Sequence, residues 1–160
     1  PEFLIRTFLS RTHSTDFLCI LGEGPLFPSC RKLAKDFSRI ILPGNVTNVT
    51  DYLRVADFVI SASRSEGMPN AVLEGLALGL PAILSDIPAH REILKISPMA
   101  GKLFKIGDHK NLAICLTQPF HQTASDSARK LATDYFNAKS MSDNYQNLYK
   151  KTTGNVEIVT

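Results

Sequence analysis

Residues 57–85, DFVISASRSEGMPNAVLEGLALGLPAILS, contain the pattern that decides the fold. The stretch opens with a short apolar run at 57–61, crosses a polar loop, continues as a helix-forming segment over 69–78 and closes with a second apolar run at 81–85. Short apolar runs bounded by turn residues are typical of strands buried on both faces of a sheet. The middle segment has a proline at its start and Gly79 just past its end, as helices often do. The stretch therefore predicts strand, loop, helix and strand.

The same alternation extends in both directions along the chain. Further helices are expected over 1–10, 25–37, 49–55, 89–94 and 108–116, with two more over 123–150, and further strands over 17–21, 39–42 and 102–104. Alternating strands and helices predict an α/β domain, a Rossmann-like, doubly wound parallel sheet covered on both faces. Ligands of such sheets bind beyond the carboxyl ends of the strands. The loops of interest are those after Leu21, Leu42, Ser61 and Leu84.

Composition excludes several classes of protein. The chain has 160 residues, 44% of them apolar, which fits one globular domain. Its net charge is only +3, and it has no long run of Lys and Arg, so we expect no nucleic-acid partner. No apolar run reaches the ~18 residues of a membrane-spanning helix, and the first residues do not resemble a signal peptide.

Cysteine usage indicates a reducing compartment. The three cysteines, Cys19, Cys30 and Cys115, form no C-x-x-C pair, so we expect neither a disulfide scaffold nor a cysteine zinc site. We expect all three to be buried free thiols, and the protein to be cytoplasmic.

Two carboxylates frame the start of the helix predicted at 69–78. Glu66 lies one turn before this helix, and Glu74 shares a helix face with Asn70. The first turn of a helix presents unpaired N–H groups and the positive end of the dipole, so a diphosphate can bind there. Carboxylates beside such a site suit hydroxyl groups, and a nucleotide-sugar carries both chemistries. The simpler interpretation is that Glu66 is a loop charge and Glu74 lies on a solvated helix face.

The wider pattern resembles a known family. Glu66 and Glu74 form an E-x7-E pair, followed by Gly79-Leu80-Pro81 and by Ser85-Asp86-Ile87-Pro88. Gly22-Glu23-Gly24-Pro25 and the short loop after Pro43-Gly44 fit the same family. The chain resembles, over about residues 1–150, the C-terminal, donor-binding domain of the GT-B retaining glycosyltransferases, called family 4 or glycosyltransferases group 1.

The resemblance implies a role for each matching residue. Glu66 would be the catalytic residue and face the donor sugar, and Glu74 would hold the ribose hydroxyls. The loop and first helical turn would wrap the sugar and diphosphate through Gly67, Met68, Pro69, Asn70 and Ala71. The base would contact Gly22, Asn45 and Val46.

The resemblance also implies that parts of the enzyme lie upstream. The family has a first strand and an Arg/Lys loop before the helix expected at 1–10, and an N-terminal domain that binds the acceptor. We therefore expect residues 1–150 to form a nucleotide-sugar-binding domain, inactive alone, with a loose tail over 151–160.

The implied reaction transfers a sugar from a nucleoside diphosphate to an acceptor hydroxyl with retention of configuration, without a metal ion or a cofactor. We expect a UDP-sugar such as a UDP-N-acetylhexosamine, and a glycan or lipid-linked glycan of bacterial surface polysaccharide, lipopolysaccharide or O-antigen assembly as acceptor. The alternatives are a GDP-mannose-dependent mannosyltransferase, an epimerase and an inactive nucleotide-binding module.

Two further signals remain open. His90 follows a strand-end loop, and we expect it at the surface of a helix start, with contact to the acceptor as the alternative. The lysines Lys130, Lys139, Lys150 and Lys151 predict a solvated helix face, or a weak peripheral contact with anionic lipid at the inner face of the cytoplasmic membrane.

Overall fold

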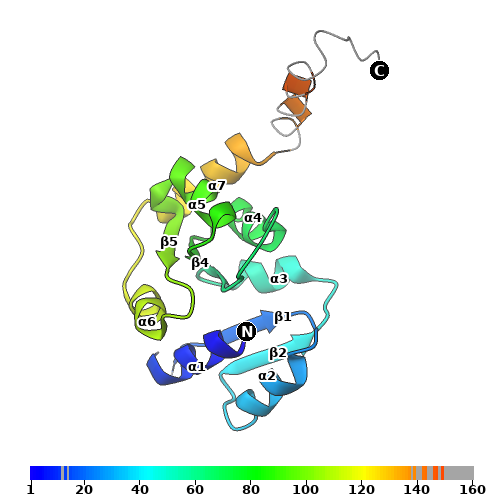
Figure 1. Cartoon of the computed structure of the whole chain (residues 1–160), viewed down its shortest axis with the longest axis vertical. Helices are drawn as coiled ribbons and strands as arrows, with labels where there is room; N and C mark the ends of the chain where they lie inside the picture. Colours follow the sequence, from blue (N-terminus) through cyan, green and yellow to red (C-terminus); the bar gives the residue numbers. More distant parts are fainter. Residues whose placement is uncertain are drawn as a thin grey trace.

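The computed structural model describes residues 1–11, 13, 15–137, 139, 142–143, 146–147 and 149. Strands and helices alternate along the chain (Figure 1). The helices are α1 (Glu2–Arg11), α2 (Phe27–Ala34), α3 (Val49–Arg54), α4 (Asn70–Ala77), α5 (Pro88–Ile96), α6 (His109–Thr117) and α7 (Ala124–Tyr135), with a 3-10 turn η1 at Pro98–Ala100. The strands are β1 (Leu18–Leu21), β2 (Ile40–Gly44), β3 (Val59–Ser61), β4 (Ala82–Ser85) and β5 (Gly101–Phe104).

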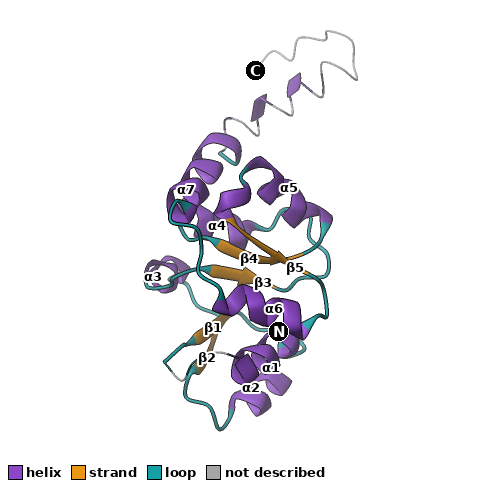
Figure 2. Cartoon of the chain, turned by 90° about the vertical axis from the view of Figure 1, so that its left-hand side faces the viewer, coloured by secondary structure: helices purple, strands orange, loops and turns teal. Residues whose placement is uncertain are grey.

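All strand pairs are parallel, but the strands form two separate sheets. β1 pairs with β2, and β3, β4 and β5 pair in that order. Helices lie on both sides of the strands, with α3 on one side and α1 and α6 on the other (Figure 2). The prediction of a Rossmann-like, doubly wound α/β fold is confirmed. Within the described residues no strand joins β1 to β3, so each of these strands has one edge without a strand partner.

Burial differs sharply between the strands. All four residues of β4 are buried, whereas every residue of β3 is only half-buried. β1 is buried only at Leu18. A strand in the middle of a doubly covered sheet is normally buried on both faces, so the partial exposure of β1 and β3 follows from their open edges.

Two apolar clusters hold the helices to the strands. The first joins α1, β1, β2 and α6 around Ile5, Ile40 and Leu112. The second packs α4, α5 and α7 against β4 around Leu76 and Leu84. The second cluster fixes the helix that carries Glu74.

Two expectations about local structure need correction. The second helix begins at Phe27 rather than at Pro25, because the residues before it form a turn in which Phe27 N–H donates to the Gly24 carbonyl (2.9 Å). Cys30 and Cys115 are buried free thiols as expected, but Cys19 is exposed. The first of the two helices expected over 123–150 is α7, which ends at Tyr135. The second falls in a range that the structure describes only in part, and the tail over 151–160 lies outside the described residues.

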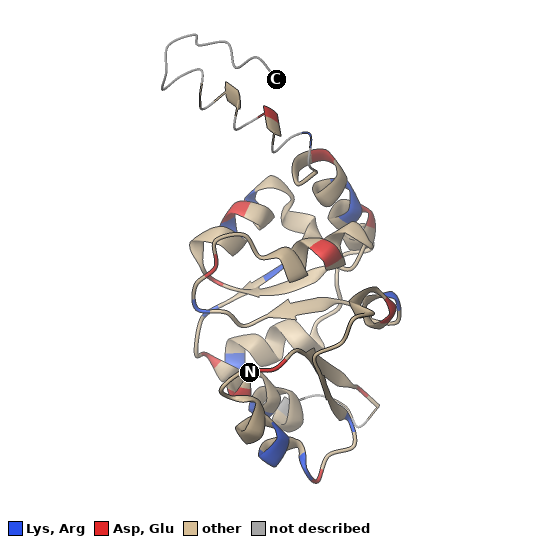
Figure 3. Ribbon diagram, turned by 90° about the vertical axis from the view of Figure 1, so that its right-hand side faces the viewer, with Lys and Arg blue, Asp and Glu red and all other residues tan. Residues whose placement is uncertain are grey.

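Within the described ranges, no helix has the length and apolar character needed to cross a membrane. Basic and acidic residues are interspersed over the described part of the chain (Figure 3).

Candidate functional site

The loop between β3 and α4, together with α4 itself, carries most of the predicted donor-binding residues. Glu66, Gly67 and Met68 are exposed, whereas Pro69 is buried and precedes the first residue of α4. The Pro69 carbonyl accepts from two N–H groups of the first helical turn, at 2.9 and 3.1 Å. This turn has no side-chain cap and no acidic residue. The first turn of α4 therefore keeps the polarity that favours an anion.

Packing of α4 against the sheet sets the direction of Glu74. Val72, Gly75 and Leu76 are buried, and an added Cβ on Gly75 would lie 2.3 Å from Val59 Cγ1. Asn70 and Glu74 lie on the exposed side of the helix, as predicted. Helical spacing predicts that Ala77 lies on the buried apolar face with Val72 and Leu76, but this is wrong, because Ala77 is exposed.

The helix ends where the sequence predicts. Gly79 adopts a positive φ of 84°, a conformation that suits glycine because other residues are strained there. The Leu80 N–H donates to the Gly75 carbonyl (3.0 Å), and the Gly79 N–H donates to the Leu76 carbonyl (2.9 Å). This pair of bonds is a Schellman motif, which satisfies the last carbonyls of the helix.

Behind Glu66 lies a hydrogen-bond network that the sequence did not reveal. The Ser63 hydroxyl donates to Glu66 Oε1 (2.6 Å), and the Ser85 hydroxyl donates to the Ser63 carbonyl (2.5 Å). His90 Nδ1 lies 2.8 Å from the Ser85 carbonyl oxygen. His90 is fully buried, so the expectation of a surface residue at the helix start was wrong: its ring turns inward beneath the loop after β4.

The predicted base-contacting residues meet at the carboxyl ends of β1 and β2. Gly22 has a φ of 99°, and its N–H donates to the Gly44 carbonyl (2.7 Å), which ties the two strand-end loops together. Asn45 is exposed and Val46 half-buried directly after Gly44. Gly22 also lines a cavity of about 260 Å³. The other residues of this cavity are Pro1, Ile20, Leu21, Glu23, Gly24, Pro25, Leu26, Phe27, Cys30 and Leu42.

The structure thus brings the predicted residues together in two groups. One contains Gly22, Asn45 and Val46, and the other follows the loop and helix from Glu66 to Glu74. Within the described residues, no hydrogen bond or ion pair joins the two groups. The first group follows the strands of the two-stranded sheet, and the second follows β3 of the three-stranded sheet.

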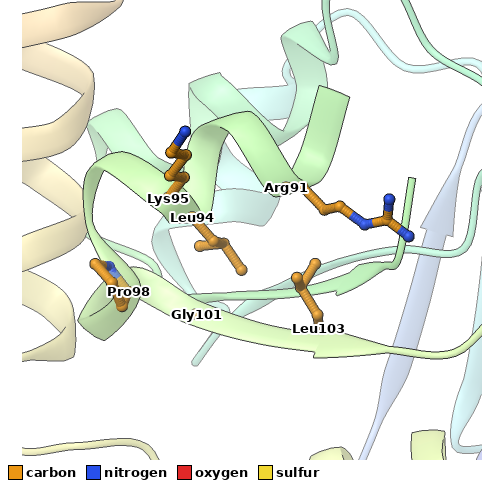
Figure 4. A pocket seen from close by; sticks show the side chains of 6 residues that line it. All are labelled: Arg91, Leu94, Lys95, Pro98, Gly101 and Leu103. Carbon is orange, nitrogen blue, oxygen red and sulfur yellow. The ribbon is translucent and has the colours of Figure 1, made fainter. Parts of the chain in front are cut away.

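A second cavity of about 330 Å³ lies between α5 and β5, away from these residues (Figure 4). Its floor is apolar, with Leu94 and Leu103, and Arg91 and Lys95 extend in different directions from α5 (Figure 4). Arg91 forms two hydrogen bonds with the Asp86 carboxylate, at 2.5 and 3.1 Å. These bonds lower the pKa of Asp86 below its usual value and raise the pKa of Arg91.

Sequence reasoning missed Ser63 and the roles of Ser85 and His90. Ser85 lies inside the quoted Ser-Asp-x-Pro motif, and Ser61 and Ser63 alternate at the end of a strand. Polar residues at strand ends were therefore the available signal. As for metals, the described residues contain no group of three or more His, Cys, Asp or Glu side chains that could hold an ion.

Comparison with known proteins gives the family. The family model described as "Glycosyl transferases group 1" matches residues 1–120. The chain belongs to the group 1 glycosyltransferases. The sequence-based resemblance to a GT-B glycosyltransferase domain is thereby confirmed.

Individual relatives of this group 1 domain agree. It is 31% identical over 120 residues to "Putative glycosyltransferase EpsD" of Bacillus subtilis, covering 73% of this chain and 31% of that protein. It is 24% identical over 140 residues to "N-acetyl-alpha-D-glucosaminyl L-malate synthase" of Bacillus anthracis, covering 82% and 36%. The solved structure of Anabaena HepE in complex with UDP superposes with a TM-score of 0.78 at 15% identity, covering 94% of this chain and 44% of that one. The chain spans about a third of the length of the curated relatives it matches.

Proposed function

We propose that this group 1 domain binds the nucleotide-sugar donor of a retaining glycosyltransferase. The observation that carries the proposal is the arrangement around α4: an uncapped first helical turn between two exposed carboxylates, Glu66 and Glu74. The turn suits the diphosphate, and the carboxylates suit the hydroxyls of the sugar and the ribose. An added Cβ on Gly67 would meet nothing within 4 Å, so a ligand has room to approach this backbone.

The proposed donor is a UDP-sugar, such as a UDP-N-acetylhexosamine. Support comes from two proteins it resembles: the Anabaena relative was solved with UDP, and the Bacillus anthracis relative is named for an N-acetylglucosaminyl product. The base would lie against Gly22, Asn45 and Val46, and Gly22 borders the cavity beside β1, whose lining includes the apolar Ile20 and Leu42.

In the proposed reaction, the acceptor hydroxyl attacks the donor sugar from the face that the diphosphate leaves. The bond between the sugar and the phosphate oxygen breaks as the new glycosidic bond forms. The departing oxygen takes up the negative charge and accepts the proton that the acceptor hydroxyl loses. The positive end of the α4 dipole would stabilise that charge, and preorganised charge stabilisation of this kind is often the largest catalytic contribution. Glu66 would orient the sugar. The proposed acceptor is a lipid-linked glycan of surface polysaccharide assembly, reached at the inner face of the cytoplasmic membrane.

We further propose that residues upstream of Pro1 complete this domain with a strand and a basic loop, and that a separate domain holds the acceptor. The open edges of β1 and β3 support the proposal of an additional strand, because one strand lying between them would join the two sheets. A basic loop following that strand would supply charge opposite the first turn of α4.

The test is a two-dimensional amide NMR titration of the chain with UDP, GDP and NAD in parallel. UDP is expected to shift the amides of Gly22, Val46 and 67–74. Glu74→Ala should weaken UDP binding by about tenfold or more, since hydrogen bonds to charged groups contribute about 1.5–3 kcal/mol. Glu92→Ala, which removes an exposed glutamate from α5, is the matched control and should bind like the wild type.

The other outcomes are equally informative. A preference for GDP would keep the transferase and change the donor to a GDP-sugar such as GDP-mannose. A response to NAD alone would contradict the proposal. Silence with all three ligands calls for the same titration with the upstream residues restored, and silence there too would leave an inactive module.

A further inference from the structure

Two buried polar residues behind the proposed site have no part in the function described so far. His90 is fully buried, and Ser85 is 1% exposed. Among the described residues, His90 Nε2 is the one buried side-chain nitrogen or oxygen without a hydrogen-bond partner. Because burying an unpaired polar atom costs free energy, a plain packing role would be filled better by an apolar side chain.

The geometry fixes the tautomer of His90. Its Nδ1 lies 2.8 Å from the Ser85 carbonyl oxygen, and a carbonyl oxygen can only accept. The proton of the neutral imidazole must therefore lie on Nδ1, which leaves Nε2 as the bare nitrogen without a donor. The unpaired Nε2 is the consequence of keeping Nδ1–H directed at Ser85.

This tautomer sets the direction of the Ser85 hydroxyl bond, and the Glu66 carboxylate, which can only accept, sets the direction of the other bonds. Ser85 Oγ lies 3.2 Å from His90 Nδ1 and can only accept there, so its own proton goes to the Ser63 carbonyl (2.5 Å). The Ser61 hydroxyl donates to Ser63 Oγ (3.3 Å), and the Ser63 hydroxyl donates to Glu66 Oε1 (2.6 Å). Hydrogen bonds that run in one direction polarise one another. The Ser85 bond ends on the Ser63 carbonyl, and the Ser61 and Ser63 hydroxyl bonds end on the Glu66 carboxylate, so the two sets of bonds meet at Ser63.

The network also connects two strand–helix units. Ser61 ends β3, Ser85 ends the neighbouring β4, and His90 belongs to the first turns of α5. The loop that carries Glu66 is exposed from 64 to 68, so its own packing does not fix the carboxylate. The loop is held instead by hydrogen bonds that begin at Ser85 of β4 and His90 of α5.

We propose that His90 and Ser85 are positioning residues that orient the Glu66 carboxylate through Ser63. The inference rests on the proposed function only where it assigns Glu66 to the donor sugar. The orientation of the loop itself is independent of that assignment.

The test compares His90→Asn with His90→Gln. The amide nitrogen of asparagine can take the place of Nδ1 and keep the bond to Ser85, whereas that of glutamine reaches toward the place of Nε2. Positioning predicts that Asn preserves the order of the Glu66 loop and Gln does not. Packing alone predicts the reverse, because asparagine leaves the larger void. Nitrogen-15 NMR of the wild-type imidazole reports the tautomer directly.

Two readouts separate this inference from the proposed function. The first is backbone relaxation of the amides of Ser63 and Glu66, which needs no ligand. The second is the ratio of affinities for UDP-N-acetylglucosamine and UDP, since only the sugar would meet Glu66. His90→Gln is expected to reduce that ratio by about threefold to tenfold, the effect of one hydrogen bond, with UDP affinity unchanged.

Ser63→Ala and Ser85→Ala keep the inference testable if the His90 variants do not fold. Both should loosen Glu66 as His90→Gln does, and Ser29→Ala, which removes a serine hydroxyl bond in α2, should not. An Nε2–H tautomer, or equal loss of loop order in the Asn and Gln variants, would overturn the inference. If the wild type binds neither ligand but the loop readout holds, the proposed function fails and the positioning stands.

Discussion

Gly75 fixes the distance between α4 and β3, and replacing it tests the packing beneath the site. An added Cβ would lie 2.3 Å from Val59 Cγ1 and 3.1 Å from Cγ2, whereas ordinary contacts are 3.4–4 Å. The helix or the valine must therefore move by about 1 Å. Valine is stiff at χ1, and overpacking of this kind costs about 1–3 kcal/mol. Alanine in a helix gains back about 1 kcal/mol over glycine.

The two contributions are separated by a second substitution. In the wild type, Gly75→Ala should lower the free energy of unfolding by as much as about 2 kcal/mol, the overpacking cost less the helix gain. In a Val59→Ala background the obstructing methyl groups are gone, and the same change should raise it by up to about 1 kcal/mol. The coupling between the two positions is then about 1–3 kcal/mol.

Urea unfolding followed by circular dichroism measures all four proteins of this cycle, with midpoints compared at constant slope. An equal effect of Gly75→Ala in both backgrounds would refute the close packing of α4 on β3. Gly67→Ala is the control, since its Cβ would enter open space.

The remaining predictions concern charge and thiols. Arg91→Met should raise the pKa of Asp86 toward its ordinary value, because the two guanidinium hydrogen bonds that lower it are lost; carbon-13 NMR of the carboxyl group measures this, and an unchanged midpoint would contradict the pair. Since the pKa of Asp86 is lowered on folding, the pair stabilises the fold above about pH 4 and loses that effect as the pH falls through the folded-state pKa, a dependence that the variant should lack. Brief alkylation of the native protein should modify the exposed Cys19 and spare the buried Cys30 and Cys115. Because desolvation raises the thiol pKa of all three cysteines, exposure alone decides the order of labelling. Mass spectrometry counts the labels, and modification of either buried thiol would show that the structure around it opens.

The sequence was informative wherever local rules dominate. The run at 57–85 predicted β3, α4 and β4 to within two residues, because apolar runs, a proline and a positive-φ glycine each act locally. The exposed face with Asn70 and Glu74 followed from helical spacing alone.

Long-range packing was beyond those rules. Nothing in the spacing of residues shows that His90 turns inward, since that depends on a carbonyl of β4 that accepts from its ring. The exposure of Cys19 likewise depends on what lies beside β1 in space. The division of the strands into two sheets depends on which strands pair with each other, and apolar runs alone do not specify the pairing.

The open edges of β1 and β3 have a practical consequence for solubility. Unpaired edge N–H and C=O groups are a template for strand addition, which proteins commonly discourage with lysine or proline. β1 reads LCIL and β3 reads VIS, so neither carries a charge or a proline. At high protein concentration, chains of this sequence should therefore associate through these edges. An extended peptide that seals both edges would suppress aggregation and raise the melting temperature.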